Sequence, residues 1–259
     1  MLYDKVHQIY FSAMGTTKKI VEAVSRELAD QAAALPFKPG PPAQVVQFGP
    51  NDLAVVGMPV FSGRLPAFGA EYLAGFKGRS TPAVAVVVYG NRAYEDALIE
   101  MSDILQSNGF KVFGAAAFIA RHSIFPDIAA QRPDDDLKII TQFGRDCAGK
   151  LSTAASPDEL SEVTVKGNRP YREVGPGGLK PVTGETCTLC GTCVEVCPVQ
   201  ALRIEDETLI MDNDRCNACT ACIYACPEKA RSFQGPQYEG FGQMLKEKTK
   251  ERQEPDVFI

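Results

Sequence analysis

This sequence predicts an α/β domain built on a doubly wound, five-stranded parallel sheet, followed by a smaller α+β domain. Apolar runs alternate with helical patterns up to residue 151, a stretch rich in Pro, Gly and Ser occupies residues 152–181, and eight of the nine cysteines lie between residues 187 and 226. Alternating strands and helices are typical of parallel sheets, and long irregular stretches are uncommon inside compact domains. We therefore expect a first domain at 1–151, a linker at 152–181, a second domain at 182–232 and a tail at 233–259.

The strands of the first domain are expected in five β-rich runs, at residues 6–11, 45–48, 53–56, 82–89 and 111–120. The fourth run is mostly Val and Ala, as is typical of a strand buried on both faces. Helices are expected at 17–33, near 66–75, and at 92–108 and 134–151, and the first has Ile20, Val21, Val24 and Leu28 at amphipathic spacing. In such a sheet, ligands bind beyond the carboxyl ends of the strands.

The second domain contains two matching sets of four cysteines. Each set reads C-x2-C-x2-C-x3-C-P, and the second repeats the first at an offset of 29 residues. This is the bacterial two-cluster pattern, in which the fourth cysteine of each set binds the other set's cluster. One 4Fe-4S cluster is therefore predicted on Cys187, Cys190, Cys193 and Cys226, and a second on Cys216, Cys219, Cys222 and Cys197.

Cysteines in proteins have two other common uses, structural zinc and disulfides. Structural zinc uses paired C-x2-C units, often with histidine, but no histidine lies in this region. Disulfides suit small secreted domains, whereas the start of the chain has no secretory pattern, and we expect a reducing, cytoplasmic location. Clusters are the interpretation that the spacing favours.

Charge and hydropathy narrow the choice of partners. The net charge of −5 gives no footprint for nucleic acid, and no apolar run is long enough to predict a membrane span. Between residues 182 and 232, eight acidic and four basic residues leave a local charge of −4. Such a surface would steer a basic protein redox partner, although acidic residues can also simply keep a small domain soluble. The oligomeric state is left open.

The loop from Ser12 to Thr17 lies between the first expected strand and the first expected helix. Its hydroxyl groups, together with the free N–H groups of a helix N-terminus, form an anion site suited to a terminal phosphate. No lysine is needed, in contrast to a Walker loop. The alternative is an ordinary helix cap, with Ser12 or Thr16 as the N-cap residue.

The same loop resembles the FMN phosphate motif of flavodoxins, Thr/Ser-x-Thr-Gly-x-Thr. Ser12, Gly15 and Thr17 match it, while Met14 replaces the central threonine and removes one hydroxyl contact. The resemblance implies a flavodoxin-like domain with strand order 2-1-3-4-5, in which two further loops border the isoalloxazine ring. The residues implied to bind flavin are Ser12, Met14, Gly15, Thr16, Thr17, Pro59, Val60, Phe61, Ser62, Gly63, Arg64, Tyr89, Gly90, Asn91, Arg92, Tyr94 and Asp96.

Particular roles, and alternatives to them, follow for some of these residues. Phe61 offers a ring to stack on the flavin, or packs on the following helix. Gly90 permits a close approach of the backbone to a ring, and Asn91 caps the next helix or contacts the flavin. His122 contacts the flavin, moves a proton, or is a structural hydrogen-bonding residue. Cys147, outside both cysteine sets, is expected to be a small buried residue.

Over residues 5–232, the chain resembles the flavodoxin-ferredoxin fusion family of anaerobic bacteria and archaea, including its loops PVFSGRLP, YGNRAYEDAL and ARHS. The resemblance implies an electron-transfer iron-sulfur flavoprotein with FMN and two 4Fe-4S clusters in a ferredoxin-like second domain. One alternative is a flavin-dependent reductase of a small acceptor such as a quinone, and another is a scaffold that has lost FMN. Whether it is an enzyme is left open, and no catalytic residue is predicted. The linker is expected to lie on the first domain near the flavin, and the tail either docks as a helix or frays.

Overall fold

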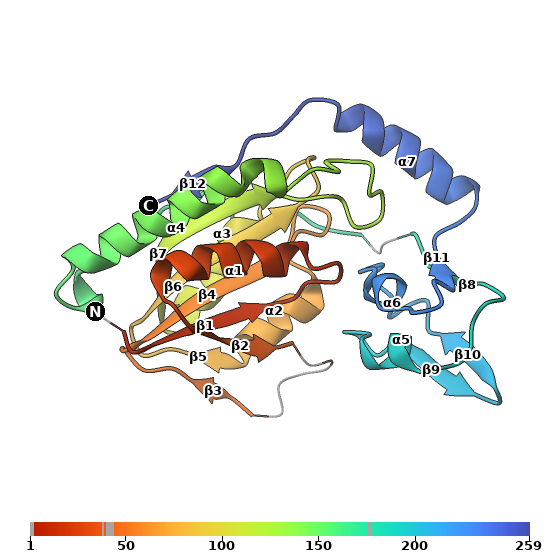
Figure 1. The fold of residues 1–259 in the computed structure, drawn as a ribbon, viewed down its shortest axis with the longest axis horizontal. Helices are drawn as coiled ribbons and strands as arrows, with labels where there is room; N and C mark the ends of the chain where they lie inside the picture. Colours follow the sequence, from red (N-terminus) through yellow and green to blue (C-terminus); the bar gives the residue numbers. More distant parts are fainter. Residues whose placement is uncertain (1–2, 38, 40–43, 176–177) are drawn as a thin grey trace.

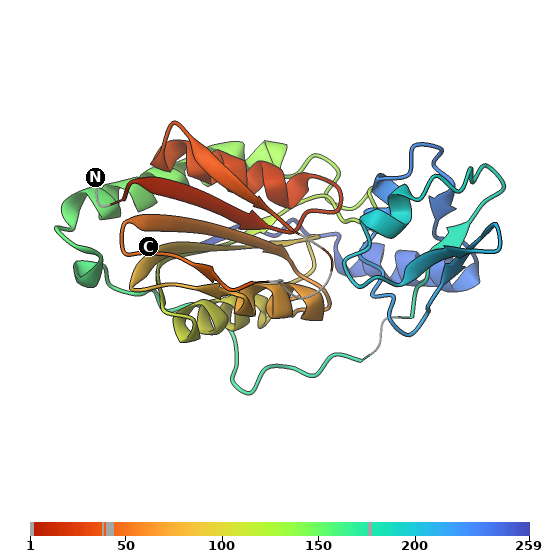
Figure 2. The same ribbon diagram turned by 90° about the horizontal axis from the view of Figure 1, so that it is seen from below.

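The computed structural model describes residues 3–37, 39, 44–175 and 178–259. They form two domains, and the C-terminal segment returns from the second domain to the first (Figures 1 and 2). No helix in these ranges has the length and apolar character that a membrane crossing requires.

The central sheet has six strands in the order β12-β7-β6-β4-β1-β2. Five of them are parallel, and together they form the sheet that the sequence predicts. Numbered along the chain, these five strands have the order 2-1-3-4-5, which is the flavodoxin-like form of the doubly wound sheet. Their bounds are β1 (Lys5–Tyr10), β2 (Ala32–Pro36), β4 (Asp52–Pro59), β6 (Thr81–Tyr89) and β7 (Phe110–Ile119).

The second strand of this sheet is not the run predicted at residues 45–48. In the described chain, β3 (Val46–Gln47) pairs with β5 (Phe76–Lys77) in a separate two-stranded sheet. The edge of the main sheet is instead β2, whose Ala32 lies opposite Val6. The first helix, α1 (Thr16–Leu28), therefore ends before the alanine-rich run that was expected to continue it. Pairing with β1 overrides the helix propensity of alanine here.

Two helices cover each face of the sheet. One core contains α1 and α4 (Leu137–Thr153), and the other contains α2 (Ala67–Ala74) and α3 (Ala97–Ser107). β6 serves both cores: Val84 and Val86 belong to the first, and Ala83 and Ala85 to the second. The expected helix start at residue 134 is a short 3-10 turn, η1 (Asp134–Asp136), which leads into α4. The ninth cysteine, Cys147, is fully buried on α4, as predicted.

The C-terminal tail docks on the first domain. After α7 (Pro236–Lys248), the chain forms β12 (Asp256–Phe258), which pairs antiparallel with β7, Val257 lying opposite Ala116. The sheet thus has five parallel strands, the predicted number and order, plus an antiparallel sixth strand at the edge. Figure 1 shows how α7 and the following segment connect the two domains along one side.

Asn91 holds the segment between α7 and β12. Its Nδ2 donates to the carbonyl oxygens of Thr249 at 2.9 Å and Glu251 at 3.0 Å, and its Oδ1 accepts the amide of Gln253 at 3.0 Å. The Asn91 side chain is only 6% exposed, so these bonds satisfy a buried amide. A residue predicted from sequence to contact flavin or cap a helix instead anchors the tail.

The linker also lies against the first domain. The buried carboxylate of Asp96 accepts the backbone amides of Asn168 at 2.8 Å and Arg172 at 2.7 Å. Arg64 stacks over the ring of Tyr171 at 4.6 Å, and its Nη1 donates to the carbonyl oxygen of Arg172 at 2.7 Å. The expectation that the linker docks is confirmed. Of the residues in this linker, 176 and 177 lie outside the described ranges.

The second domain repeats its backbone as well as its cysteines. Positive φ angles recur at an offset of 29 residues: Leu189 with Ala218 (both 56°), Gly191 (82°) with Thr220 (70°), and Gln200 (50°) with Lys229 (51°). Residues 202–211 form an antiparallel hairpin. The elements are β8 (Val182–Thr183), α5 (Thr192–Glu195), β9 (Leu202–Glu205), β10 (Thr208–Met211), α6 (Ala221–Tyr224) and β11 (Arg231–Ser232).

Candidate functional site

The eight cysteines of the two sets line two separate small voids in the second domain. The first void is lined by Cys187, Cys190, Cys193 and Cys226, and the second by Cys197, Cys216, Cys219 and Cys222. Each void thus takes three cysteines from one sequence repeat and the last cysteine from the other. This is the crossed grouping that the sequence predicts. We call these the outer void and the inner void, respectively.

The cysteine chemistry of both voids suits iron-sulfur clusters. All nine cysteines of the chain are free thiols, so disulfide pairing does not account for the repeat. Four cysteines around one void are the ligand set of a 4Fe-4S cluster.

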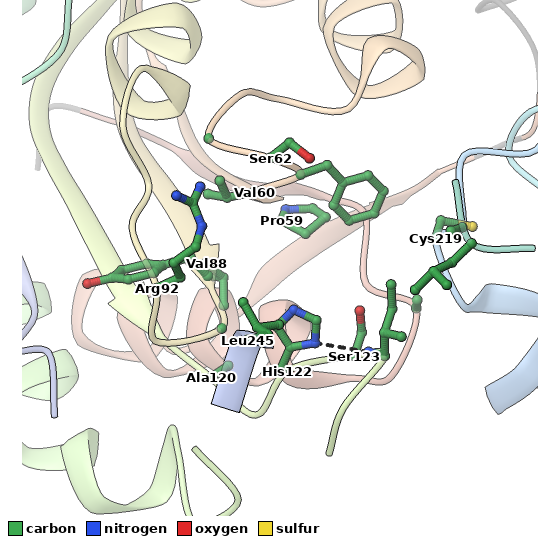
Figure 3. A pocket seen from close by; sticks show the side chains of 18 of the residues that line it. Pro59, Val60, Ser62, Val88, Arg92, Ala120, His122, Ser123, Cys219 and Leu245 are labelled. Atoms are coloured by element: carbon green, nitrogen blue, oxygen red, sulfur yellow. Dashed lines mark hydrogen bonds between the residues drawn. The ribbon is translucent and has the colours of Figure 1, made fainter. Parts of the chain in front are cut away.

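A larger cleft of about 530 Å³ lies between the two domains. It opens beyond the carboxyl ends of β1, β4, β6 and β7, and therefore includes the switch point between β1 and β4 where doubly wound sheets bind ligands. Its volume is within the usual range for small-molecule sites. Figure 3 shows side chains from several segments around it, among them Pro59, Val88, His122, Cys219 and Leu245.

Two sides of the cleft come from outside the first domain. Phe241, Met244 and Leu245 of α7 line one side, and Asn217, Ala218 and Cys219 of the second domain line another. These last three residues also line the inner void, so cleft and inner void share one segment of chain. Cys219 is 8% exposed, whereas Cys190, in the outer void, is exposed. The inner void is consequently the one next to the cleft.

The predicted phosphate loop borders the cleft at the N-terminus of α1. Met14, Thr16 and Thr17 line the cleft, and Gly15 has the left-handed φ of 88° that glycine adopts without strain. Ser12 is not among the lining residues, and its Oγ accepts the amide of Lys18 at 3.2 Å. The N-cap position is Gly15 and has no side-chain cap, so neither Ser12 nor Thr16 is the N-cap residue. First-turn amides without intrahelical partners are left for an anion.

The loop after β4 divides between the cleft and the linker. Pro59, Val60, Phe61, Ser62 and Gly63 line the cleft. Phe61 also packs edge-on against Phe68 of α2, with ring centroids 6.3 Å apart, so both of its expected roles are compatible. A side chain at Gly63, whose φ is 83°, would collide with Glu95.

Arg64 is not among the residues that line the cleft. Its guanidinium makes a bidentate pair with the buried carboxylate of Glu100, at 2.7 Å from Nε and 2.8 Å from Nη2. This hydrogen-bonded pairing raises the pKa of Arg64. Together with its contacts to Tyr171 and Arg172, the pair makes Arg64 a link between the first domain and the linker.

The loop after β6 divides in the same way. Tyr89, Gly90 and Arg92 line the cleft. Tyr94 donates its hydroxyl to Asp256 of the tail at 2.6 Å, while Asn91 and Asp96 hold the tail and the linker as described above. These three residues therefore contact the tail and the linker, and they do not line the cleft.

Gly90 is required by a neighbouring protein side chain. A Cβ atom at this position would overlap the imidazole ring of His122. The close approach predicted for Gly90 is present toward the ring of His122. Gly90 also lines the cleft, and its contact with a flavin stays a prediction.

His122 presents a neutral imidazole to the cleft. Its Nδ1 accepts the amides of Ile124 and Phe125, both at 3.2 Å, which places the proton on Nε2. Burial lowers the pKa of His122 to about 4, so the ring is uncharged near neutral pH. The side chain lines the cleft, with Nε2 on the opposite edge of the ring from the two amides (Figure 3). His122 is thus a structural residue and also a potential N–H donor to a ligand.

Sequence reasoning missed the cleft residues contributed by the linker, the second domain and the tail. Arg172 and Leu179 come from the linker, and Gln237 and Lys248 lie on α7 with the apolar residues named above. The linker is expected near the flavin from its sequence. The tail carries no sequence signal for a cleft, because its apolar residues contact a domain more than 100 positions away in the sequence.

Comparisons with known proteins agree with this division. Residues 186–230 match the family model of the 4Fe-4S dicluster domain. The chain thus joins a flavodoxin-like domain, defined by its strand order, to a 4Fe-4S-binding domain of the ferredoxin type.

Two solved structures were also found to be similar. One is a flavodoxin from the domain Archaea, with 18% identity, a TM-score of 0.40, and coverage of 57% of this chain and 99% of that one. The other is an NADH:FMN oxidoreductase in its apo form, with 16% identity, a TM-score of 0.41, and coverage of 61% and 94%. No curated protein matches the chain.

Proposed function

We propose that this protein is an electron-transfer flavoprotein that holds FMN in the interdomain cleft and two 4Fe-4S clusters in the cysteine-lined voids. When bound, FMN takes up one or two electrons and each cluster takes up one, so that together they convert between two-electron and one-electron traffic. The observation that carries the proposal is the position of Cys219, which lines the cleft and the inner void at once.

The cleft residues fit FMN in three ways. The N-terminus of α1 offers amides and the hydroxyls of Thr16 and Thr17 to a phosphate. Phe61, Val60 and Met244 offer apolar surface to a planar ring system. His122 offers a neutral N–H group, so it can donate a hydrogen bond to a carbonyl or ring nitrogen without adding charge.

The positions of the two voids support an order for the clusters along the electron path. Cys216, Cys219, Cys222 and Cys197 would hold the cluster beside the cleft, and Cys187, Cys190, Cys193 and Cys226 the one near the surface. Exposed acidic residues surround the outer end, including Glu228, which lines the outer void, and Glu205 to Glu207 at the hairpin turn. This surface suits a basic protein redox partner, whose association would weaken as salt screens the charges.

A carrier fits the cleft better than a reductase that must supply protons to a small acceptor. No carboxylate is among the described residues that line the cleft, and burial keeps the His122 imidazole neutral while its Nδ1 accepts two backbone amides. The cleft is also bordered by α7 and by the second domain, which contributes Cys219, a proposed cluster ligand, to its wall.

The phosphate loop provides a direct test of the FMN assignment. Replacing Met14 with Thr supplies a hydroxyl at the position where the flavodoxin motif has one, and a hydrogen bond to a charged group contributes about 1.5 kcal/mol or more. We expect M14T to bind FMN about tenfold more tightly than the wild type. Riboflavin, which lacks the phosphate, is the control, and its affinity should not improve. Anaerobic fluorescence titration of flavin-free protein measures all four values.

Two results would contradict the assignment. One is a wild-type protein that takes up neither flavin. The other is FMN and riboflavin bound equally in both proteins, which would show that the α1 N-terminus does not hold the phosphate.

A further inference from the structure

Arg231 is a buried cation between the two sets of cysteines. Its residue is only 4% exposed, and it lies in β11 directly after the second cysteine repeat. Its side chain lines the outer void, and its Nη2 lies 3.9 Å from Sγ of Cys222, which lines the inner void. The same guanidinium therefore lies next to both voids.

The matching position of the other repeat holds an uncharged residue. At the offset of 29 residues, the counterpart of Arg231 is Leu202, which is 5% exposed and lines the inner void. One repeat thus places a leucine beside its void and the other places a charge. The other three basic residues of the domain, Arg203, Arg215 and Lys229, are exposed.

Neutral groups of the protein satisfy Arg231 only in part. Its Nη1 donates to Oγ1 of Thr183 and its Nη2 lies 3.3 Å from Sδ of Met211, a weak acceptor. Nε is buried without a hydrogen-bond partner, and among the described residues no carboxylate pairs with this side chain. A buried charge without a counter-ion is strongly unfavourable, so an anion is expected beside it.

We propose that Arg231 is the built-in counter-ion of the two iron-sulfur clusters, which retains them and raises their reduction potentials. The inference rests on the proposed function, since it needs clusters in the voids. A cluster with four thiolate ligands is anionic, and reduction adds one further negative charge. A fixed positive charge therefore favours the reduced form. Cluster net charge and hydrogen bonds to sulfur are known controls of the potential.

The test compares four proteins, all purified anaerobically with their clusters: the wild type, R231L, R231K and R203L. R231L restores the residue type of the matching repeat position, and R231K keeps the charge. R203L removes one positive charge from the same domain at a side chain that is 59% exposed. Iron and sulfide content are measured for each protein, followed by a redox titration monitored by electron paramagnetic resonance.

We expect R231L to lower the potential of at least one cluster by the equivalent of a tenfold change in its reduction equilibrium, which is about 59 mV for a one-electron couple. R203L should stay at the wild-type value, and R231K should lie closer to wild type than R231L does. Loss of iron in R231L but not in R231K also supports the proposal, because it assigns cluster retention to the charge.

Three outcomes would overturn it: unchanged potentials and iron content in R231L, an equal shift in R203L, or loss of iron in R231L and R231K alike. The last would make the shape of arginine, and not its charge, the requirement. A wild-type protein without iron and sulfide would instead contradict the proposed function itself, which keeps the two failures distinct.

Discussion

Replacing Cys219 with alanine is expected to lower the iron content from about eight to about four atoms per chain and to disconnect the flavin from the remaining cluster. The reason is the place of Cys219 in the wall shared by the cleft and the inner void. Without the inner cluster, electrons delivered to the flavin have no intermediate site on the way to the exposed Cys190. Stopped-flow reduction of the flavin should then no longer be followed by bleaching of the iron-sulfur absorbance.

Two matched variants sharpen this prediction. C190A removes a predicted ligand of the cluster in the outer void. It should therefore lose the same amount of iron but keep electron transfer from the flavin to the inner cluster. C147A changes the ninth cysteine, which is buried in the first domain, and should keep all of the iron. If C219A and C190A behaved alike in single-turnover kinetics, the order of cleft, inner void and outer void would be wrong.

A chain that ends at Ser232 is expected to bind FMN at least tenfold more weakly than the full-length protein, which corresponds to about 1.4 kcal/mol. The deletion removes α7, whose Phe241, Met244 and Leu245 line the cleft, and exposes the edge of β7 that β12 covers. Burial of apolar side chains against a ligand contributes binding free energy in proportion to their area. Fluorescence titration with FMN, on both proteins under the same anaerobic conditions, gives the comparison.

The variant N91A separates the docking of the tail from the composition of the cleft. It cuts three hydrogen bonds between Asn91 and the tail, but Asn91 does not line the cleft. We expect a loss of about 2–4 kcal/mol in the free energy of unfolding of the first domain, because buried backbone groups are left without partners.

For the chain that ends at Ser232, the contradicting result is FMN binding as tight as in the full-length protein, which would show that α7 is not part of the flavin site.

The parts of the fold that the sequence predicted are those with strong local signals. Composition predicts the Val-rich β6, and the periodicity of apolar residues predicts the amphipathic α1. β2 does not, since Ala32 to Ala34 have no β propensity and become a strand by pairing with β1. β12 is three residues long, and its pairing with β7 depends on contacts across more than 100 positions.

The same distinction applies to the site. The cysteine grouping was predicted because cluster ligation imposes a fixed local spacing, and the voids reproduce it. The three loops predicted to bind flavin border the cleft, but Arg64, Tyr94 and Asp96 contact the linker and the tail instead. A loop sequence shows which side chains are near a site, whereas the segment that each one faces is decided by distant parts of the chain.

The most direct test of the central claim is a cofactor analysis of the anaerobically purified, full-length protein. Flavin released by acid is identified and quantified, and iron and sulfide are counted on the same sample. Our account predicts about one FMN with about eight iron and eight sulfide per chain. A full complement of iron without flavin, even after incubation with FMN, would contradict it and leave a ferredoxin-type domain joined to a flavodoxin-like domain that binds no flavin.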